Sequence, residues 1–238
     1  ENWNRSCAFK NEAQLRAMRA RRTSCKNSTM QSQVTLANGG PNIILFVVDS
    51  VPATSVTKSQ ESVTSFDFLQ KVEHYFETCH YLQHHHAASS YTHDAFFSML
   101  HSIVPLGNEY IQKSVPLTML SSAGYTTSAF LNGAIGADYC KVQLRDQNDG
   151  MRYLDHLHVV DHDSKVEEDA RRWITEQKKE FFSIVYFEGT HLLEGQGTNF
   201  ENEFLEIMSQ IDRIVGSVSG DLLYFVTSDH GCLQKGGS

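Results

Sequence analysis

Acidic side chains and a histidine follow two apolar runs of the sequence, at the points where those runs end. The run at residues 43–48 leads directly into Asp49, and the run at residues 222–227 is followed closely by Asp229 and His230. If both runs are strands of one parallel sheet, the three side chains meet at the same rim, beyond the carboxyl ends of the strands. An acid after a single strand is more often a turn or cap residue, so the prediction depends on the joint pattern. Carboxylate and imidazole ligands together indicate a divalent metal such as zinc or manganese.

A hydroxyl nucleophile for such a metal is available in the segment SSYTHDAFFSML, residues 89–100. The segment has small polar residues followed by a helical pattern, which predicts that Thr92 lies at a helix N-terminus. The free N–H groups and the positive end of the dipole at that position attract an anionic phosphate. A bound divalent metal would lower the pKa of the hydroxyl and activate it for attack. The alternative is that Thr92, or Ser90, serves only as an N-cap.

The elements that must position these residues alternate along the chain. Four apolar, β-branched runs lack the alternation of a half-exposed strand, which predicts strands buried on both faces; they cover residues 43–48, 126–131, 182–187 and 222–227. The segments between them have apolar residues at helical spacing: Phe66, Leu69, Val72 and Phe76; Ala95, Met99 and Leu100; Val166, Ala170, Trp173 and Ile174; and Phe204, Ile207, Ile211 and Val215. This order predicts an α/β fold, a three-layer sandwich with a mainly parallel central sheet.

Length, composition and charge restrict the class of protein further. The 238 residues are 40% hydrophobic, enough for a substantial core. The formal net charge of -8 argues against a nucleic-acid partner, which usually requires a basic face. Anionic substrates then need a metal or a local cluster to attract them. No apolar run approaches the roughly 18 residues that span a bilayer.

The first 40 residues differ in composition from the rest of the chain. They carry Arg16, Arg19, Arg21 and Arg22 with few large apolar residues. We interpret residues 1–40 as a basic and polar N-terminal extension, either a solvated tail or a juxtamembrane or partner-binding segment. The turn-forming sequence NGGP at residues 38–41 then separates this extension from residues 41–238, which we expect to form the catalytic domain.

Four segments in this order resemble the alkaline phosphatase/sulfatase superfamily. PNIILFVVDS, residues 41–50, is similar to its opening strand, and FVTSDHG, residues 225–231, to its late metal-binding strand. LTMLSSAGYTTSAF, residues 117–130, is similar to the helix and strand that follow the nucleophile helix. FFSIVYFEGTH, residues 181–191, is similar to the strand that ends in an active-site histidine. The resemblance implies an alkaline phosphatase-like fold for residues 41–238.

The segment around Thr92, the candidate nucleophile, is similar to that of one group of enzymes within the superfamily. Thr92-His93-Asp94 is similar to the corresponding segment of lipoteichoic acid synthases and related phosphoglycerol or phosphoethanolamine transferases. That resemblance implies phosphate-ester chemistry through a threonine, with one metal ion: manganese or zinc first, calcium or magnesium as alternatives. It places Asp49, Thr92, Asp229 and His230 at the metal and gives His191 a role in proton transfer or substrate contact. It also implies an extracytoplasmic, membrane-associated setting and a substrate that includes a lipid head group.

The chain departs from the superfamily pattern in three places. It lacks the Cys/Ser-x-Pro-x-Arg motif of sulfatases, which weighs against the alternative of a sulfuric ester hydrolase. Ser50 follows Asp49 where many members have a second acid, so we expect one metal rather than two at this position. The superfamily continues beyond the Asp-His-Gly motif with another strand, so we expect a C-terminally incomplete domain. Two further expectations follow: a second chain that completes the sheet beside residues 222–227, or a catalytically inactive binding domain of the same fold.

The remaining histidines fall in two groups, His74, His80, His84, His85 and His86, and then His156, His158 and His162. In an extended strand the side chains of the His84–His86 run would point to opposite faces, so we expect surface or rim positions for them. Residues 161–163, Asp-His-Asp, precede a helical pattern and are interpreted as its N-terminal cap region.

Overall fold

A computed structural model of the chain describes residues 40–56, 64–77, 79–80, 82, 86–101, 115–133, 154–191 and 198–231. All of them belong to one compact unit, Leu36–Ser238. The predicted N-terminal extension lies outside the described residues except for Gly40, as do His84 and His85. No helix in this described part of the chain has both the length and the apolar character needed to cross a membrane.

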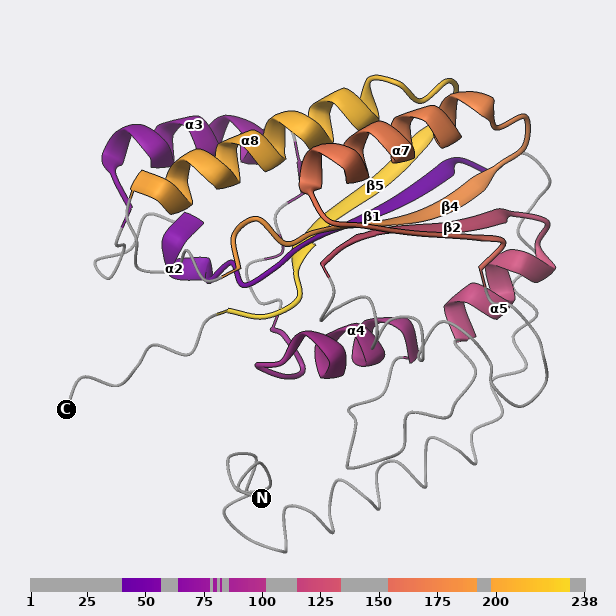
Figure 1. Cartoon of the computed structure of the whole chain (residues 1–238), viewed down its shortest axis with the longest axis horizontal. Helices are drawn as coiled ribbons and strands as arrows, with labels where there is room; N and C mark the ends of the chain where they lie inside the picture. The colour runs from indigo at the N-terminus through magenta and orange to yellow at the C-terminus, as the bar shows by residue number, and fades with distance from the viewer. Residues whose placement is uncertain are drawn as a thin grey trace, which may run out of the picture. The chain divides into compact units, whose positions relative to one another are not determined.

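The centre of the unit is a five-stranded sheet whose four strand pairings are all parallel (Figure 1). The strand order is β3-β2-β4-β1-β5. The strands are β1 (Asn42–Val48), β2 (Thr126–Asn132), β3 (His156–Val160), β4 (Phe181–Phe187) and β5 (Leu222–Ser228). The four predicted runs form β1, β2, β4 and β5. The edge strand β3, with the sequence HLHVV, was not predicted, because its two histidines hide the apolar pattern.

Helices cover both faces of the sheet, as Figure 1 shows. The helices α3 (Phe66–Glu77), α7 (Asp163–Glu176) and α8 (Thr198–Val215) lie on one face, and α4 (Thr92–His101) and α5 (Val115–Ser122) on the other. The short α2 (Ala53–Val56) follows the end of β1. The predicted three-layer α/β sandwich with a parallel sheet is therefore confirmed.

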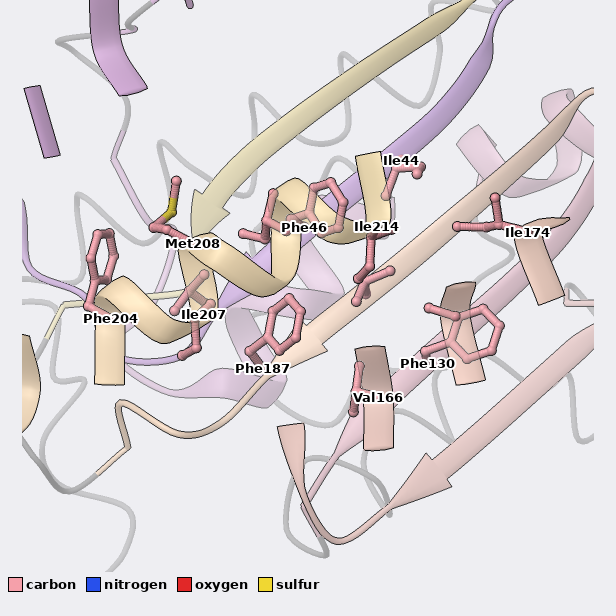
Figure 2. Close-up of a cluster of buried hydrophobic side chains, with 14 of the residues drawn as sticks. Ile44, Phe46, Phe130, Val166, Ile174, Phe187, Phe204, Ile207, Met208 and Ile214 are labelled. Carbon is pink, nitrogen blue, oxygen red and sulfur yellow. The ribbon is translucent and has the colours of Figure 1, made fainter. Parts of the chain in front are cut away.

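The two faces of the sheet form two separate cores. Along β1, Ile44, Phe46 and Val48 point into the first core and Val47 into the second. The first core packs the sheet against α3, α7 and α8, and its labelled members include Val166, Phe204 and Ile207 in Figure 2. The second core places Phe96 of α4 and Leu117 of α5, both fully buried, against the opposite face. Because β1, β2 and β4 are buried on both faces, their sequences lack the alternation of a surface strand.

Within the described part of the chain, β5 lies at one edge of the sheet and is more poorly covered than the other strands. Its four central side chains, Leu223, Tyr224, Phe225 and Val226, retain 45%, 37%, 50% and 42% of their accessible surface. They alternate between the two faces, so neither face is shielded by a helix of the described part of the chain. An apolar edge with free backbone groups is a template for pairing with another strand.

We predict that Phe225→Lys weakens self-association of the chain, or its association with a second polypeptide, by roughly tenfold or more, because a charged residue on an edge strand opposes strand pairing. Sedimentation velocity over a range of concentrations measures the effect. Phe66→Lys is the matched control, since Phe66 is 64% exposed but begins a helix. A wild-type chain that sediments as a monomer at every concentration would contradict the prediction.

Candidate metal centre

The register of the sheet brings the two acidic strand ends together. Strands β1 and β5 pair in parallel with Val48 opposite Ser228, so Asp49 and Asp229 each follow a paired residue. Both carboxylates are almost completely buried, with 1% of their surface exposed. Burying two carboxylates side by side is costly unless hydrogen bonds or a cation compensate their charge.

Asp229 has one compensated oxygen and one free oxygen. Its Oδ1 accepts hydrogen bonds from the backbone N–H groups of Ser50, at 3.0 Å, and of His230, at 2.7 Å. Its Oδ2 is buried and has no hydrogen-bond partner. Burial, followed by the negative charge of Asp49, raises the pKa of Asp229. A buried acceptor with no partner, on a carboxyl that resists ionisation, is the feature that a cation would satisfy.

Asp49 is held through both of its oxygens. Oδ1 accepts from the Ser50 hydroxyl at 2.7 Å, and Oδ2 accepts from the Tyr186 hydroxyl at 2.7 Å. Burial and the negative charges of Asp49 and Asp229 raise the pKa of Tyr186 well above its usual value, so the phenol stays protonated and donates. The hydroxyl of Thr190 donates to the backbone carbonyl of Asp49. These contacts fix the orientation of the Asp49 carboxylate.

The Nε2 atom of His230 lies close to the carboxylates of both Asp49 and Asp229. Its Nδ1 lies 2.9 Å from the carbonyl oxygen of Gly231, which can only accept, so we assign the proton to Nδ1. Nε2 then carries a lone pair, as a metal-binding imidazole requires. Nε2 is 3.6 Å from Asp49 Oδ1 and 3.6 Å from Asp229 Oδ2.

These three residues fit a metal ion. Each residue offers one possible ligand atom, and these atoms all lie within 4.8 Å of one another. Among the described residues, this is the group of histidine and acidic side chains close enough together to hold one metal ion. Ligand atoms bound at about 2.0–2.2 Å to one tetrahedral zinc ion lie roughly 3.3–3.6 Å apart, which is close to the two measured separations. The free Asp229 Oδ2 and the unprotonated Nε2 of His230 are the two atoms that such an ion would use first.

Thr92 lies at the same place, although it comes from α4, a helix that packs on one face of the sheet, and not from a strand end. It is the first residue of α4, and its Oγ1 is 3.1 Å from His230 Nε2. Ala95 and Phe96, which are buried, hold this first turn against the sheet. The Phe96 ring packs edge-on against Tyr186, with centroids 5.3 Å apart. Tyr186 therefore supports the Thr92 helix through its ring and Asp49 through its hydroxyl.

His191 completes the set of residues that the sequence singled out. It follows β4 in a tight turn closed by its own N–H, which donates to the Glu188 carbonyl at 2.7 Å. Its Nδ1 is 3.0 Å from Asp49 Oδ2, although the angles do not make a hydrogen bond. The structure thus brings Asp49, Thr92, His191, Asp229 and His230 to one rim. Their roles in metal binding and catalysis stay predictions.

Two residues at this site were not predicted from the sequence. Tyr186 lies inside an apolar run, where it looks like any other core residue. Ser50 was noted only because it is not an acid, yet its φ of 56° puts it in the left-handed region that favours glycine. Its N–H and hydroxyl reach Asp229 and Asp49 in that conformation. Non-glycine residues held at positive φ are concentrated at functional sites, but no sequence pattern reveals this one.

We predict that Tyr186→Phe lowers zinc or manganese affinity by roughly 10- to 100-fold, the usual effect of losing a hydrogen bond to a metal ligand. The ring that packs on Phe96 is kept, so the fold should persist. Competition with a chelating dye measures the affinity. Tyr125→Phe is the control: Tyr125 is also a buried tyrosine of the second core, and its hydroxyl donates to the Pro41 carbonyl instead. Equal affinity in the two variants would remove Tyr186 from the site.

Comparison with known proteins agrees with this architecture. No family model and no curated protein matches the chain by sequence. Among solved structures, the C-terminal periplasmic domain of EcEptC from Escherichia coli matches with a TM-score of 0.60 at 15% identity, covering 80% of this chain and 63% of that one. The same domain in complex with Zn matches with a TM-score of 0.50 at 14% identity, covering 83% and 65%. The chain thus spans less than two thirds of the length of those domains.

At 15% identity the match establishes the fold rather than the activity. The fold implied by the sequence resemblance is therefore confirmed: the described part of this chain has the α/β architecture of the EcEptC periplasmic domain.

Proposed function

We propose that the chain carries out metal-dependent transfer or hydrolysis of phosphate esters, with Thr92 as the nucleophile. The observation that carries the proposal is the 3.1 Å separation of Thr92 Oγ1 and His230 Nε2. That contact places a hydroxyl at a helix N-terminus beside two buried carboxylates and an unprotonated imidazole. A hydroxyl that served only as a helix cap would have no reason to meet this group of residues.

In the first half of the proposed reaction, Thr92 Oγ1 attacks phosphorus. The Oγ1–P bond forms while the P–O bond to the leaving alcohol breaks, so that a phosphothreonine results. Thr92 loses one proton and the leaving alkoxide gains one. In the second half, water or an acceptor alcohol attacks phosphorus, the Oγ1–P bond breaks, and Thr92 recovers its proton. Both halves balance without a redox partner.

A divalent metal held by Asp49, Thr92, Asp229 and His230 would lower the pKa of the hydroxyl and stabilise charge on the phosphoryl oxygens. Manganese or zinc suits the mixed oxygen and nitrogen ligands best. The chain itself contributes orientation. Ser50, Tyr186 and the backbone N–H groups hold the carboxylates, and α4 directs its N-terminal N–H groups at the incoming anion.

His191 is our candidate for the proton carrier. Its Nδ1 contact with Asp49 at 3.0 Å places the ring at the rim, and about a third of its side chain is exposed. An imidazole that reaches both the site and solvent is suited to pass a proton to the leaving alcohol.

For the substrate we propose a phosphodiester of the phosphoglycerol or phosphoethanolamine kind, including lipid head groups. For the location we propose the extracytoplasmic side of a membrane. Both proposals rest on the sequence resemblance, and the periplasmic origin of the EcEptC domain is consistent with the second.

We predict that Thr92→Ala lowers kcat/KM for a chromogenic phosphodiester by at least roughly 10³-fold, as removal of a nucleophile does. Thr92→Ser should keep a measurable rate because it retains a hydroxyl. Ser98→Ala is the control on the same helix, since that hydroxyl only donates to the Asp94 carbonyl. The assay is run with manganese or zinc added, and the fold of each variant is checked by circular dichroism.

Three results would change the proposal. A Thr92→Ala chain with the full rate would move the nucleophile to Ser90 or to a water molecule. Turnover of an aryl sulfate but not of the phosphodiester would favour the sulfuric ester hydrolase. A wild-type chain that binds metal but turns over neither would favour the inactive binding domain.

A further inference from the structure

The turn that carries His191 is held by an acidic side chain from another element. It comprises residues 188–191, directly after β4, and the His191 N–H closes it on the Glu188 carbonyl at 2.7 Å. Its first two N–H groups both donate to the carboxylate of Asp163. The Glu188 N–H donates to Oδ1 at 3.0 Å, and the Gly189 N–H donates to Oδ2 at 2.9 Å. These two bonds fix the point at which the turn leaves the sheet.

Asp163 belongs to a helix, yet its carboxylate serves the turn. It is the first residue of α7 and is 7% exposed. The sequence predicted a helix cap region at residues 161–163. Instead, no side-chain cap bond forms at the N-cap His162, and the Asp163 carboxylate reaches away from α7. The amide of Asn132, the last residue of β2, also donates to Oδ1. The carboxylate therefore joins α7, the end of β2 and the turn after β4.

A carboxylate is suited to this position because its donors are divided between two oxygens. Both oxygens of an aspartate accept hydrogen bonds, whereas an asparagine would turn an NH₂ group toward one of the donors. Burial raises the pKa of Asp163, and the bonds from Glu188, Asn132 and Gly189 act against that shift. A buried acid is costly without such bonds. The bonds to the turn and to β2 therefore stabilise the acid in this position.

Gly189 leaves room for the carboxylate to approach the turn. A β-carbon at this position would lie 2.7 Å from Asp163 Oδ2 and 2.4 Å from Glu203 Oε1 of α8. Both separations are too short for non-bonded atoms, so a side chain at position 189 would push Asp163 away from the turn. The close approach of Asp163 thus requires a glycine here.

The other end of the turn is tied to the candidate metal centre. Thr190 is fully buried, and its hydroxyl donates to the backbone carbonyl of Asp49. The Nδ1 atom of His191 then lies 3.0 Å from Asp49 Oδ2. About a third of the His191 side chain is exposed, so core packing alone does not fix the ring. Its position depends on the backbone of the turn, which Asp163 holds at the start and Thr190 near the end.

We propose that Asp163 is a positioning residue, which acts through the turn at residues 188–191 to align His191 for proton transfer to the leaving alcohol. The inference rests on the proposed function for the role of His191, but not for its location. As the P–O bond breaks, the imidazolium of His191 gives its proton to the leaving oxygen, and the alcohol departs neutral. Misplacing a reacting group by about 1 Å can cost roughly 100-fold in rate.

The proposed role has a consequence that a purely structural role lacks. Proton donation matters for an alkoxide, which is a poor leaving group, and matters little for a nitrophenolate, which departs without a proton. Loss of the Asp163 contact should therefore slow the cleavage of an alkyl phosphodiester and spare that of a nitrophenyl phosphodiester. A general loss of structure would slow both alike.

The first experiment does not use turnover. Crystal structures of Asp163→Asn and Gly189→Ala are compared with that of the wild type. In both variants the separation of His191 Nδ1 and Asp49 Oδ2 should grow by roughly 1 Å or more, enough to impair proton transfer. Gly189→Ala displaces the carboxylate without removing its charge, and it serves as the second variant where Asp163→Asn does not fold.

The second experiment measures kcat/KM for glycerophosphoethanolamine and for bis(4-nitrophenyl) phosphate, with manganese or zinc added. Asp163→Asn should lower the first value at least roughly tenfold more than the second. His191→Gln should show the same selectivity, and adding Asp163→Asn to it should cost nothing further, because both changes remove one function. The matched control is Asp169→Asn: Asp169 is a buried acid of the same helix that pairs with Lys165 and Arg172, and its loss should not discriminate between the two diesters.

The possible results separate this inference from the proposed function. Equal losses for the two diesters, or a full further loss from Asp163→Asn in the His191→Gln background, would overturn the positioning role. An unmoved His191 ring in both variant structures would overturn it as well. A wild-type chain that cleaves neither diester would contradict the proposed function instead, and the crystal structures would still decide whether Asp163 places the histidine.

Discussion

The parallel register of β1 and β5 is the constraint on which the site depends. It places Asp49 and Asp229 on adjacent strand ends, each with 1% of its surface exposed. Burial removes the hydration of these carboxylates and places them side by side, and both burial and the charge of Asp49 raise the pKa of Asp229. The surrounding residues are arranged to reduce that cost. Backbone N–H groups, the Ser50 hydroxyl and the Tyr186 hydroxyl take up three of the four carboxylate oxygens, and Asp229 Oδ2 alone has no hydrogen bond.

Tyr186 joins the two layers that meet at this point. It lies on the α4 side of the sheet, and its ring packs on Phe96, which fixes the helix that begins at Thr92. Its hydroxyl fixes Asp49 on the sheet. The position of the candidate nucleophile and the orientation of a candidate ligand therefore depend on one side chain. The strained backbone of Ser50 links β1 to Asp229 in a comparable way. Both residues position others and need not touch a substrate.

Much of this arrangement could be predicted from the sequence, for physical reasons that also set its limits. Strands buried on both faces read as continuous apolar runs, so β1, β2, β4 and β5 were found. The edge strand β3 was not, because His156 and His158 are tolerated where one side faces solvent. Ligand types at strand ends predicted that Asp49 and Asp229 would meet. The supporting contacts of Tyr186, and the reach of Asp163 to the β4 loop, depend on register and side-chain direction, which residue types do not encode.

The rim as a whole sets the electrostatic conditions for any phosphate ester. The ends of four adjacent strands, β2, β4, β1 and β5, carry Asn132, Glu188, Asp49 and Asp229 in turn. A rim with this much buried carboxylate repels an anion, whereas the N-terminus of α4 attracts one. The two tendencies are reconciled only if cations occupy the rim before the substrate arrives. Metal binding would then act twice, by activating the Thr92 hydroxyl and by reversing the sign of the field that the phosphate meets. On this argument, substrate affinity as well as turnover should depend on metal.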